Sequence, residues 1–286
     1  MLSTACGGGS SATSAPTSAP ANQIAFSHVA VVILENHSYS DVIGNTDMPY
    51  LNGLAQQYGL AAQYFANAHP SLPNYFMLTT GKEETTDDNF SGIITDDNVA
   101  RELTKAGKSW KCYAEALPSV GYLGGDVYPY LRHHNPFTYF SDVQNDSSQA
   151  GNIVPFSQFA SDLANNALPQ YSFIVPDVLN DAHDGTLAQA DQWMQANLAP
   201  LISNSAFQNS GLLIITFDEG DASDSANGGG HIATVIVSAQ AKKNYVSQTL
   251  YQHQSALRLT LSASGVTSLP GEAASAPDLG EFITGQ

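Results

Sequence analysis

The sequence has few cysteines and few basic residues, and each shortage excludes a class of protein. Its 286 residues include two cysteines, so no disulfide framework can hold the fold together. Nine lysines and arginines face 26 acidic residues, for a formal net charge of -17. Such a surface repels the phosphate backbone of nucleic acids, and we expect no nucleic-acid partner. No apolar run in the sequence is long enough to span a bilayer.

The first residues differ in composition from the rest. Residues 1–24 are rich in Ser, Ala, Gly and Pro, which predicts a disordered tether before a single domain over residues 25–286. Cys6 follows a step of small residues, as at the end of a bacterial lipoprotein signal, although the charged and apolar parts of such a signal are missing. A cloned fragment that begins in a disordered tail gives the same pattern. We expect an extracytoplasmic protein (secreted, periplasmic or envelope lipoprotein) that meets a membrane only if Cys6 carries a lipid anchor.

Short apolar runs alternate with amphipathic segments along the domain. Four runs dense in β-branched residues predict strands buried on both faces, namely His28–Leu34, Tyr171–Val175, Gly211–Phe217 and Ile232–Ser238. Other segments have helical periodicity: Pro49–Tyr58, Asn98–Ala106, Thr186–Leu201 and His253–Ser262. This alternation predicts an α/β fold with a mainly parallel sheet. Residues 117–153 carry many Gly, Pro, Tyr and His residues without a clear period, and we expect them to form an insertion over the active site.

Polar residues stand at the ends of these strands. Glu35 and Asn36 end the first run, Asp218 and Glu219 end the third, and His231 comes just before the last. In open α/β sheets, ligands bind beyond the carboxyl ends of the strands. Carboxylate and amide oxygens gathered there suit a hard divalent cation. For the acidic pair after the third strand taken alone, a solvated turn is the alternative interpretation.

The segment HPSLPNY supplies a candidate nucleophile. Ser71 precedes an apolar, helix-like stretch that ends at Gly81. A serine before a helix is most often an N-cap, but in an anion site the free N–H groups of the helix bind phosphate while the hydroxyl points at it. A cation bound to Ser71 Oγ would lower the pKa of the hydroxyl and make the alkoxide available. Asn74, one turn later, could donate to a non-bridging phosphate oxygen.

Six segments stand in an order that matches a known family: ILENHSYSDVIG, HPSLPNY, RHHNPF, PDVLNDAHD, TFDEGD and GGGH. In this order they resemble the bacterial phosphoesterase family, which holds acid phosphatases and phospholipases C of the alkaline phosphatase superfamily. The resemblance covers most of the domain and implies an alkaline-phosphatase-like α/β sandwich, with a central mainly parallel sheet flanked by helices. It also implies Ser71 as the nucleophile and metal ligation by Glu35, Asn36, Ser71, Asp218 and Glu219.

The chain departs from the two-metal pattern of that superfamily, in which an Asp-His pair ends the late strand. Asp177 or Asp181, with His183 and His231, could form a second metal site, but we favour one divalent cation, with Ca, Mg, Mn and Zn all open. The imidazoles of His134, His183 and His231 would then hold the phosphate or protonate the leaving oxygen. The expected structural histidines are His28, His37, His133 and His253, and the role of His69 is left open.

Together these residues predict hydrolysis of phosphate esters through a phosphoserine intermediate on Ser71. We expect monoesters, as for an acid phosphatase, because the chain is short and shows no added lipid-binding domain. A phosphodiesterase or phospholipase C is the close alternative, because both chemistries use the same residues. The expected substrate is a phosphorylated small molecule or a phospholipid headgroup. A non-catalytic surface binding lipoprotein is the alternative from another class. A sulfatase is disfavoured, because the motif of its modified-cysteine nucleophile is missing.

Overall fold

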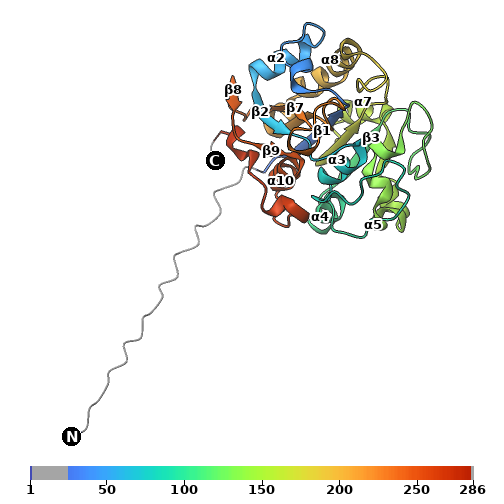
Figure 1. Cartoon of the computed structure of the whole chain (residues 1–286). Helices are drawn as coiled ribbons and strands as arrows, with labels where there is room; N and C mark the ends of the chain where they lie inside the picture. Colours follow the sequence, from blue (N-terminus) through green and yellow to red (C-terminus); the bar gives the residue numbers. More distant parts are fainter. Residues whose placement is uncertain (2–24, 285–286) are drawn as a thin grey trace.

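A single sheet organises the part of the chain that the computed structural model describes, Met1 and residues 25–284 (Figure 1). Its strands are β1 (His28–Leu34), β2 (Gly59–Phe65), β3 (Trp110–Ala114), β4 (Ile153–Pro155), β5 (Tyr171–Val175), β6 (Gly211–Phe217), β7 (His231–Val237), β8 (Tyr245–Ser247) and β9 (Tyr251–Gln252). They lie in the order β4-β3-β5-β1-β6-β7-β2-β8, with β9 paired to β2. Strand β7 is antiparallel to β6 and β2, and the other pairings are parallel.

The strands predicted from continuous apolar runs form the middle of this sheet. Strand β1 lies between β5 and β6, with Val32 opposite Ile174 and Ile215, and all three side chains are buried. The predicted bounds of β1, β5 and β6 are confirmed, whereas β7 begins one residue earlier than predicted, at His231. Because the carboxyl ends of parallel strands share an edge, the segments after β1, β2, β5 and β6 meet there, together with the start of the antiparallel β7.

Helices cover both faces of the sheet. On one face α2 (Pro49–Gln57) packs against α8 (Leu187–Ser203), and on the other α10 (His253–Ala263) packs against α3 (Ser71–Met77) and α4 (Val99–Lys105), as Figure 1 shows. The four predicted helices are confirmed within two residues of their bounds. Shorter helices are α1 (Tyr39–Val42), α5 (Ser141–Gln144), α6 (Ser147–Ala150), α7 (Ser157–Ala164) and α9 (Ser205–Ser210). The predicted α/β class with a mainly parallel sheet is confirmed.

The segment predicted as an insertion, residues 117–153, contains two 3-10 turns, η1 (Arg132–His134) and η2 (Pro136–Tyr139), before α5 and α6. Phe137 and Phe140 are fully buried, so this part of the segment contributes to the core. Burial also raises the pKa of the Cys112 thiol, as expected for a cysteine that acts as a small hydrophobic side chain. The tether and Cys6 lie outside the described residues. Within the described part, no helix is both long enough and apolar enough to cross a membrane.

Candidate active site

Ser71 lies where β2 leads into α3, and its side chain is buried. It is the first residue of that helix, and Pro70, the N-cap, forms no side-chain capping bond. The hydroxyl instead faces two carboxylates: Ser71 Oγ is 3.2 Å from Glu35 Oε2 and 3.4 Å from Glu219 Oε1. The first backbone N–H after it, that of Leu72, donates to Asp88 Oδ1 at 2.8 Å. The hydroxyl therefore contacts buried carboxylates and does not cap the helix.

The pairing of β1 with β6 brings the remaining predicted ligands to Ser71. Leu34 is opposite Phe217, so Glu35 and Asp218 follow side by side, and the Asp218 N–H donates to the Leu34 carbonyl at 2.9 Å. Asn36 has a φ of 55°, a left-handed conformation that asparagine tolerates better than most residues. Its N–H donates to Asp218 Oδ1 at 3.2 Å. The short turn thereby holds two acidic groups and one amide near Ser71.

These acidic groups are buried together. Burial raises the pKa of Glu35 well above its usual range, and the nearby Asp218 and Asp181 raise it further. Burial likewise raises the pKa of Asp218, and burial together with Asp218 raises that of Glu219 to about 9. The side-chain oxygens Asn36 Oδ1 and Asp218 Oδ2 are buried without a hydrogen-bond partner among the described residues.

Buried oxygens of this kind need a proton donor or a cation. The predicted ligands therefore fit a hard divalent cation. They are Glu35, Asn36, Ser71, Asp218 and Glu219.

A second buried group adjoins the other oxygen of Glu35. His134 Nδ1 lies 3.4 Å from Glu35 Oε1 and 3.6 Å from Asp181 Oδ2, and the Tyr75 hydroxyl donates to Glu35 Oε1. Burial lowers the pKa of His134 well below its usual range, so its imidazole is neutral here. His134 Nε2 and Asp181 Oδ2 have no hydrogen-bond partner in the described part of the chain. Glu35, His134 and Asp181 could together hold a metal ion.

Two further histidines contact the acidic residues of this site. His69, whose role the sequence left open, places Nδ1 2.7 Å from Glu219 Oε2 and Nε2 2.9 Å from the Asp224 carbonyl. His253 is fully buried, with Nε2 2.6 Å from the Asp218 carbonyl, and burial lowers its pKa to about 4. His253 thus has the structural surroundings that were expected of it. The contact of His69 with Glu219 joins residues 150 positions apart, and no local motif indicated it.

His231 is not brought to the carboxylates. Its Nε2 lies 3.0 Å from the Ala62 carbonyl, and its ring stacks against Tyr39 and Phe65 at centroid distances of 4.4 and 4.8 Å. Because His231 is the first residue of β7, its side-chain direction follows the strand and turns the ring into this aromatic stack. These contacts place the His231 ring in a packed aromatic stack.

His183 borders the site without entering the acidic cluster. Its ring centroid lies 5.9 Å from that of His134, and its Nδ1 is 2.8 Å from Asp184 Oδ1. Asp177, considered for a second metal site, instead closes its own turn: its Oδ1 accepts the Leu179 N–H at 3.1 Å. Of the two aspartates considered for that second site, the structure therefore places only Asp181 beside Glu35.

Asn74 is buried beneath the loop that carries Ser71. Its Oδ1 accepts the N–H groups of Asn67 and Ala68 at 3.0 and 3.1 Å. Its Nδ2 donates to the carbonyls of Ala68 and Pro70 at 2.8 and 3.2 Å. The amide group is therefore engaged with backbone carbonyls of the loop before α3. The amide fixes the shape of the nucleophile loop, a role that residue type and spacing did not indicate.

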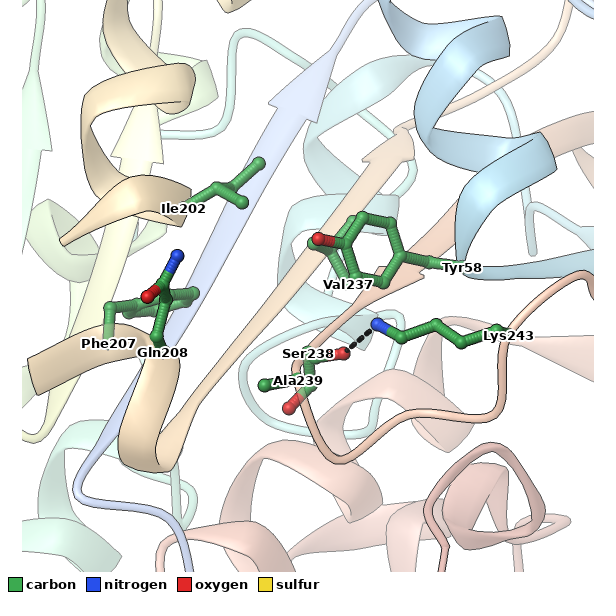
Figure 2. Close-up of a pocket in the computed structure, with 8 residues that line it drawn as sticks. All are labelled: Tyr58, Ile202, Phe207, Gln208, Val237, Ser238, Ala239 and Lys243. Carbon is green, nitrogen blue, oxygen red and sulfur yellow. Dashed lines mark hydrogen bonds between the residues drawn. The ribbon is translucent and has the colours of Figure 1, made fainter. Parts of the chain in front are cut away.

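A hollow at the opposite edge of the sheet differs from this site in its chemistry (Figure 2). It lies at the Val237 end of β7, whereas the His231 end is at the edge of the carboxylates. In Figure 2 Lys243 reaches the Ser238 carbonyl, at 2.9 Å, and its Nζ lies 3.7 Å from the centroid of the Tyr58 ring. The residues drawn there include neither a carboxylate nor an imidazole. This hollow therefore lacks the carboxylate and imidazole groups that surround Ser71.

Comparisons with known proteins agree with the chemistry of the first site. The family model described as the phosphoesterase family matches residues 45–266. The chain is 37% identical to a phosphatidylinositol-3-phosphatase of Mycobacterium tuberculosis over 229 residues, 79% of this chain and 73% of the relative. It is 33% identical to an acid phosphatase of Aspergillus fumigatus over 258 residues, 86% of this chain and 56% of the relative.

Two other matches are more limited in what they show. The chain is 32% identical to phospholipase C B of Mycobacterium tuberculosis over 128 residues, 42% of this chain and 23% of the relative. A solved structure of a protein in the alkaline phosphatase superfamily from Vibrio parahaemolyticus matches with a TM-score of 0.62 and 14% identity, covering 91% of this chain and 72% of that one. This likeness confirms the predicted fold. The chain spans little more than half the length of the fungal relative.

Proposed function

The chain belongs to the phosphoesterase family, and on this premise we propose that it hydrolyses phosphate monoesters, as an acid phosphatase does, with Ser71 as the nucleophile. Its relatives carry the names of hydrolases that act on phosphoric esters. The observation that carries the proposal is the position of the buried Ser71 hydroxyl, within 3.4 Å of two carboxylates and beside an unpaired amide oxygen of Asn36. A binding module has no need of a hydroxyl in such surroundings.

The cofactor in this proposal is one divalent cation, whose identity stays open among Ca, Mg, Mn and Zn. The residues that would hold it are Glu35, Asn36, Ser71, Asp218 and Glu219. When bound, it would supply the positive charge that keeps these carboxylates ionised and lowers the pKa of the Ser71 hydroxyl. Glu35, His134 and Asp181 form an alternative metal site. The two sites share Glu35.

The side chains of the site have separate tasks in the proposed reaction. The Ser71 hydroxyl passes its proton to a carboxylate oxygen of Glu35 or Glu219, and Oγ attacks phosphorus in line with the leaving alcohol. The bond from phosphorus to that alcohol breaks, and water then hydrolyses the phosphoserine. His69 keeps Glu219 oriented through its 2.7 Å contact. We place His134 and His183 on the leaving side, where the neutral His134 imidazole can donate a hydrogen bond to the phosphate and His183 can protonate the departing oxygen.

Phospholipase C activity is the second candidate, because one relative bears that name. We favour monoester hydrolysis, since the relatives named phosphatases match 79% and 86% of this chain and the phospholipase relative matches 42%. The substrate we propose is a phosphorylated small molecule or the headgroup of a phospholipid. An extracytoplasmic location, with or without a lipid anchor at Cys6, stays a prediction from the sequence.

Two measurements test the proposal together. Metal-stripped protein, reloaded with single cations, is assayed on paired chromogenic monoester and diester substrates, with faster turnover expected on the monoester. Acid-quenched protein is then analysed by mass spectrometry for a phosphoryl group on Ser71. Ser172→Ala, a change to a buried serine of β5, is the matched control for Ser71→Ala. Phosphate release that continues in Ser71→Ala, with no phosphoryl group on Ser71 in the wild type, would contradict the assignment.

A further inference from the structure

A polar hollow adjoins the Ser71 site on the side of the segment expected to lie over it. Its volume is about 230 Å³, and among the residues that line it are Asp88, Phe90, Asp126, Arg132, His133 and Tyr139. These come from two stretches of chain, one after α3 and the other around η1. The two stretches meet through the rings of Phe90 and Tyr139, whose centroids are 5.9 Å apart.

Two contacts fix the position of this hollow relative to the nucleophile. Asp88 Oδ1 accepts the N–H of Leu72, the residue that follows Ser71, at 2.8 Å. The ring of His133 makes an edge contact with that of His134, at a centroid distance of 4.6 Å, and His134 in turn contacts Glu35. The hollow therefore borders the reacting centre, where the alcohol part of a bound phosphate ester has room to extend.

Arg132 supplies the fixed positive charge of the hollow. Its guanidinium carbon lies 4.1 Å from the centroid of the Tyr139 ring, and its Nε is 3.3 Å from Thr138 Oγ1. Arg101 and Arg258 are each within 4 Å of a carboxylate oxygen, whereas within the described residues Arg132 forms no ion pair. In a chain with 26 acidic and nine basic residues, an arginine without a carboxylate partner beside the active site has donors to offer a ligand.

Two carboxylates also line the hollow, those of Asp88 and Asp126. Asp88 and Asp126 each use Oδ1 to accept a backbone N–H, from Leu72 and Arg132 respectively, and no hydrogen bond to their Oδ2 atoms is found among the described residues. Two carboxylates disfavour a leaving group with a second negative charge. Hydroxyl groups, in contrast, can donate to the carboxylates and accept from Arg132. The rings of Phe90 and Tyr139 add an apolar surface against which a compact ring can pack.

We propose that this hollow binds the leaving alcohol and selects a ring polyol, a hexose or a cyclitol, with Arg132 as the specificity-determining residue. The inference rests on the proposed monoester hydrolysis. The residues of the hollow indicate the class of alcohol from which the phosphate is removed. The contacts of Ser71 do not indicate it.

The test compares kcat/KM for myo-inositol 1-phosphate with kcat/KM for methyl phosphate, which fills none of the hollow. We expect the wild type to prefer the inositol ester by about tenfold or more, and Arg132→Met to lower this preference by about tenfold, because a charge-assisted hydrogen bond to a hydroxyl is lost. Arg258→Met, which removes an arginine outside the hollow, should leave the preference as it is. A preference in Arg132→Met within about twofold of that in the wild type overturns the proposal.

A binding measurement separates failure of this proposal from failure of the proposed reaction. Ser71→Ala protein and the Ser71→Ala, Arg132→Met double variant are titrated calorimetrically with myo-inositol 1-phosphate. Weaker binding in the double variant supports the hollow even if the wild type turns over neither ester, and equal binding overturns it. Arg132→Lys, which keeps the charge but loses the planar fork, replaces Arg132→Met if the latter fails to fold, and the same criteria then apply to it.

Discussion

Replacing Glu219 with glutamine tests whether the acidic cluster carries protons when no cation is bound. Burial and the neighbouring Asp218 raise the pKa of Glu219 to about 9, from an ordinary value of 4.5. Between these two pH values, metal-free protein therefore holds a proton on Glu219 in the folded state and loses it on unfolding. A group whose folded pKa is raised binds more protons in the fold, so the free energy of unfolding falls as the pH rises.

The size of this effect follows from the shift. One additional proton in the folded state gives a slope of about 1.4 kcal/mol per pH unit, so roughly 3 kcal/mol of stability is lost between pH 4.5 and pH 7. Glutamine does not titrate. The slope for metal-free Glu219→Gln should therefore be shallower by about 1.4 kcal/mol per pH unit. Glu35, Asp218 and Asp181, whose pKa values burial also raises, keep part of the slope in both proteins.

The measurement is urea unfolding in the presence of a chelator, followed by tryptophan fluorescence, between about pH 7.5 and pH 8.5, where a histidine with an ordinary pKa is mostly neutral. Glu272→Gln, at an exposed glutamate, is the control. Saturating divalent cation should flatten the wild-type slope, because a bound cation favours ionised carboxylates in the fold. Equal slopes for wild type and Glu219→Gln in chelator would refute the argument that Glu219 is protonated in the folded state.

Four other substitutions give independent tests. Ser71→Ala should lower kcat about a thousand-fold or more without changing the unfolding midpoint, and turnover within about tenfold of wild type would contradict its role. Asp218→Asn should lower the metal content found by elemental analysis, and an unchanged content would mean that Asp218 is not a ligand. His183→Ala should lower kcat and leave metal content unchanged. His253, with a pKa lowered to about 4, is neutral in the folded state above that pH. The wild type should therefore lose up to about 3 kcal/mol of stability as the pH falls from about 6.5 to about 4. His253→Asn should lose less stability over the same range.

The sequence predicted the central strands because of where they lie. A strand covered by helices on both faces needs mostly apolar side chains, and β1, β5 and β6 have them, with Ser172 and Thr216 as buried polar exceptions. Strands β2 and β3 were not predicted. The first, GLAAQYF, owes its strand conformation to its pairing with β7 rather than to β-branched residues, and the second, WKCYA, is short and carries a lysine. Their formation depends on tertiary contacts, which a local pattern does not contain.

The gathering of the candidate metal ligands at one edge was predictable for a related reason. Polar residues directly after buried parallel strands must share one edge of the sheet, and the order of the motifs named the same residues. Side-chain direction was not predictable. Asn74 and His231 have the residue types of a phosphate site, yet the first folds back on its own loop and the second packs against Tyr39 and Phe65. The direction of each side chain depends on the local turn of the backbone or on a partner distant in sequence. The spacing of residue types in the sequence determines neither of these.

The acidity of the site sets the order in which ligands can bind. Glu35, Asp218 and Glu219 are buried around Ser71, in a chain whose formal net charge is -17. A phosphate monoester is itself an anion, so it meets repulsion unless the carboxylates are neutralised first. Protons neutralise them in the metal-free protein, but a protonated Glu35 or Glu219 cannot accept the proton of the Ser71 hydroxyl. In the proposed reaction, ionised carboxylates that also tolerate a phosphate need a bound cation, and we therefore expect the affinity for the phosphate ester to rise with the concentration of that cation.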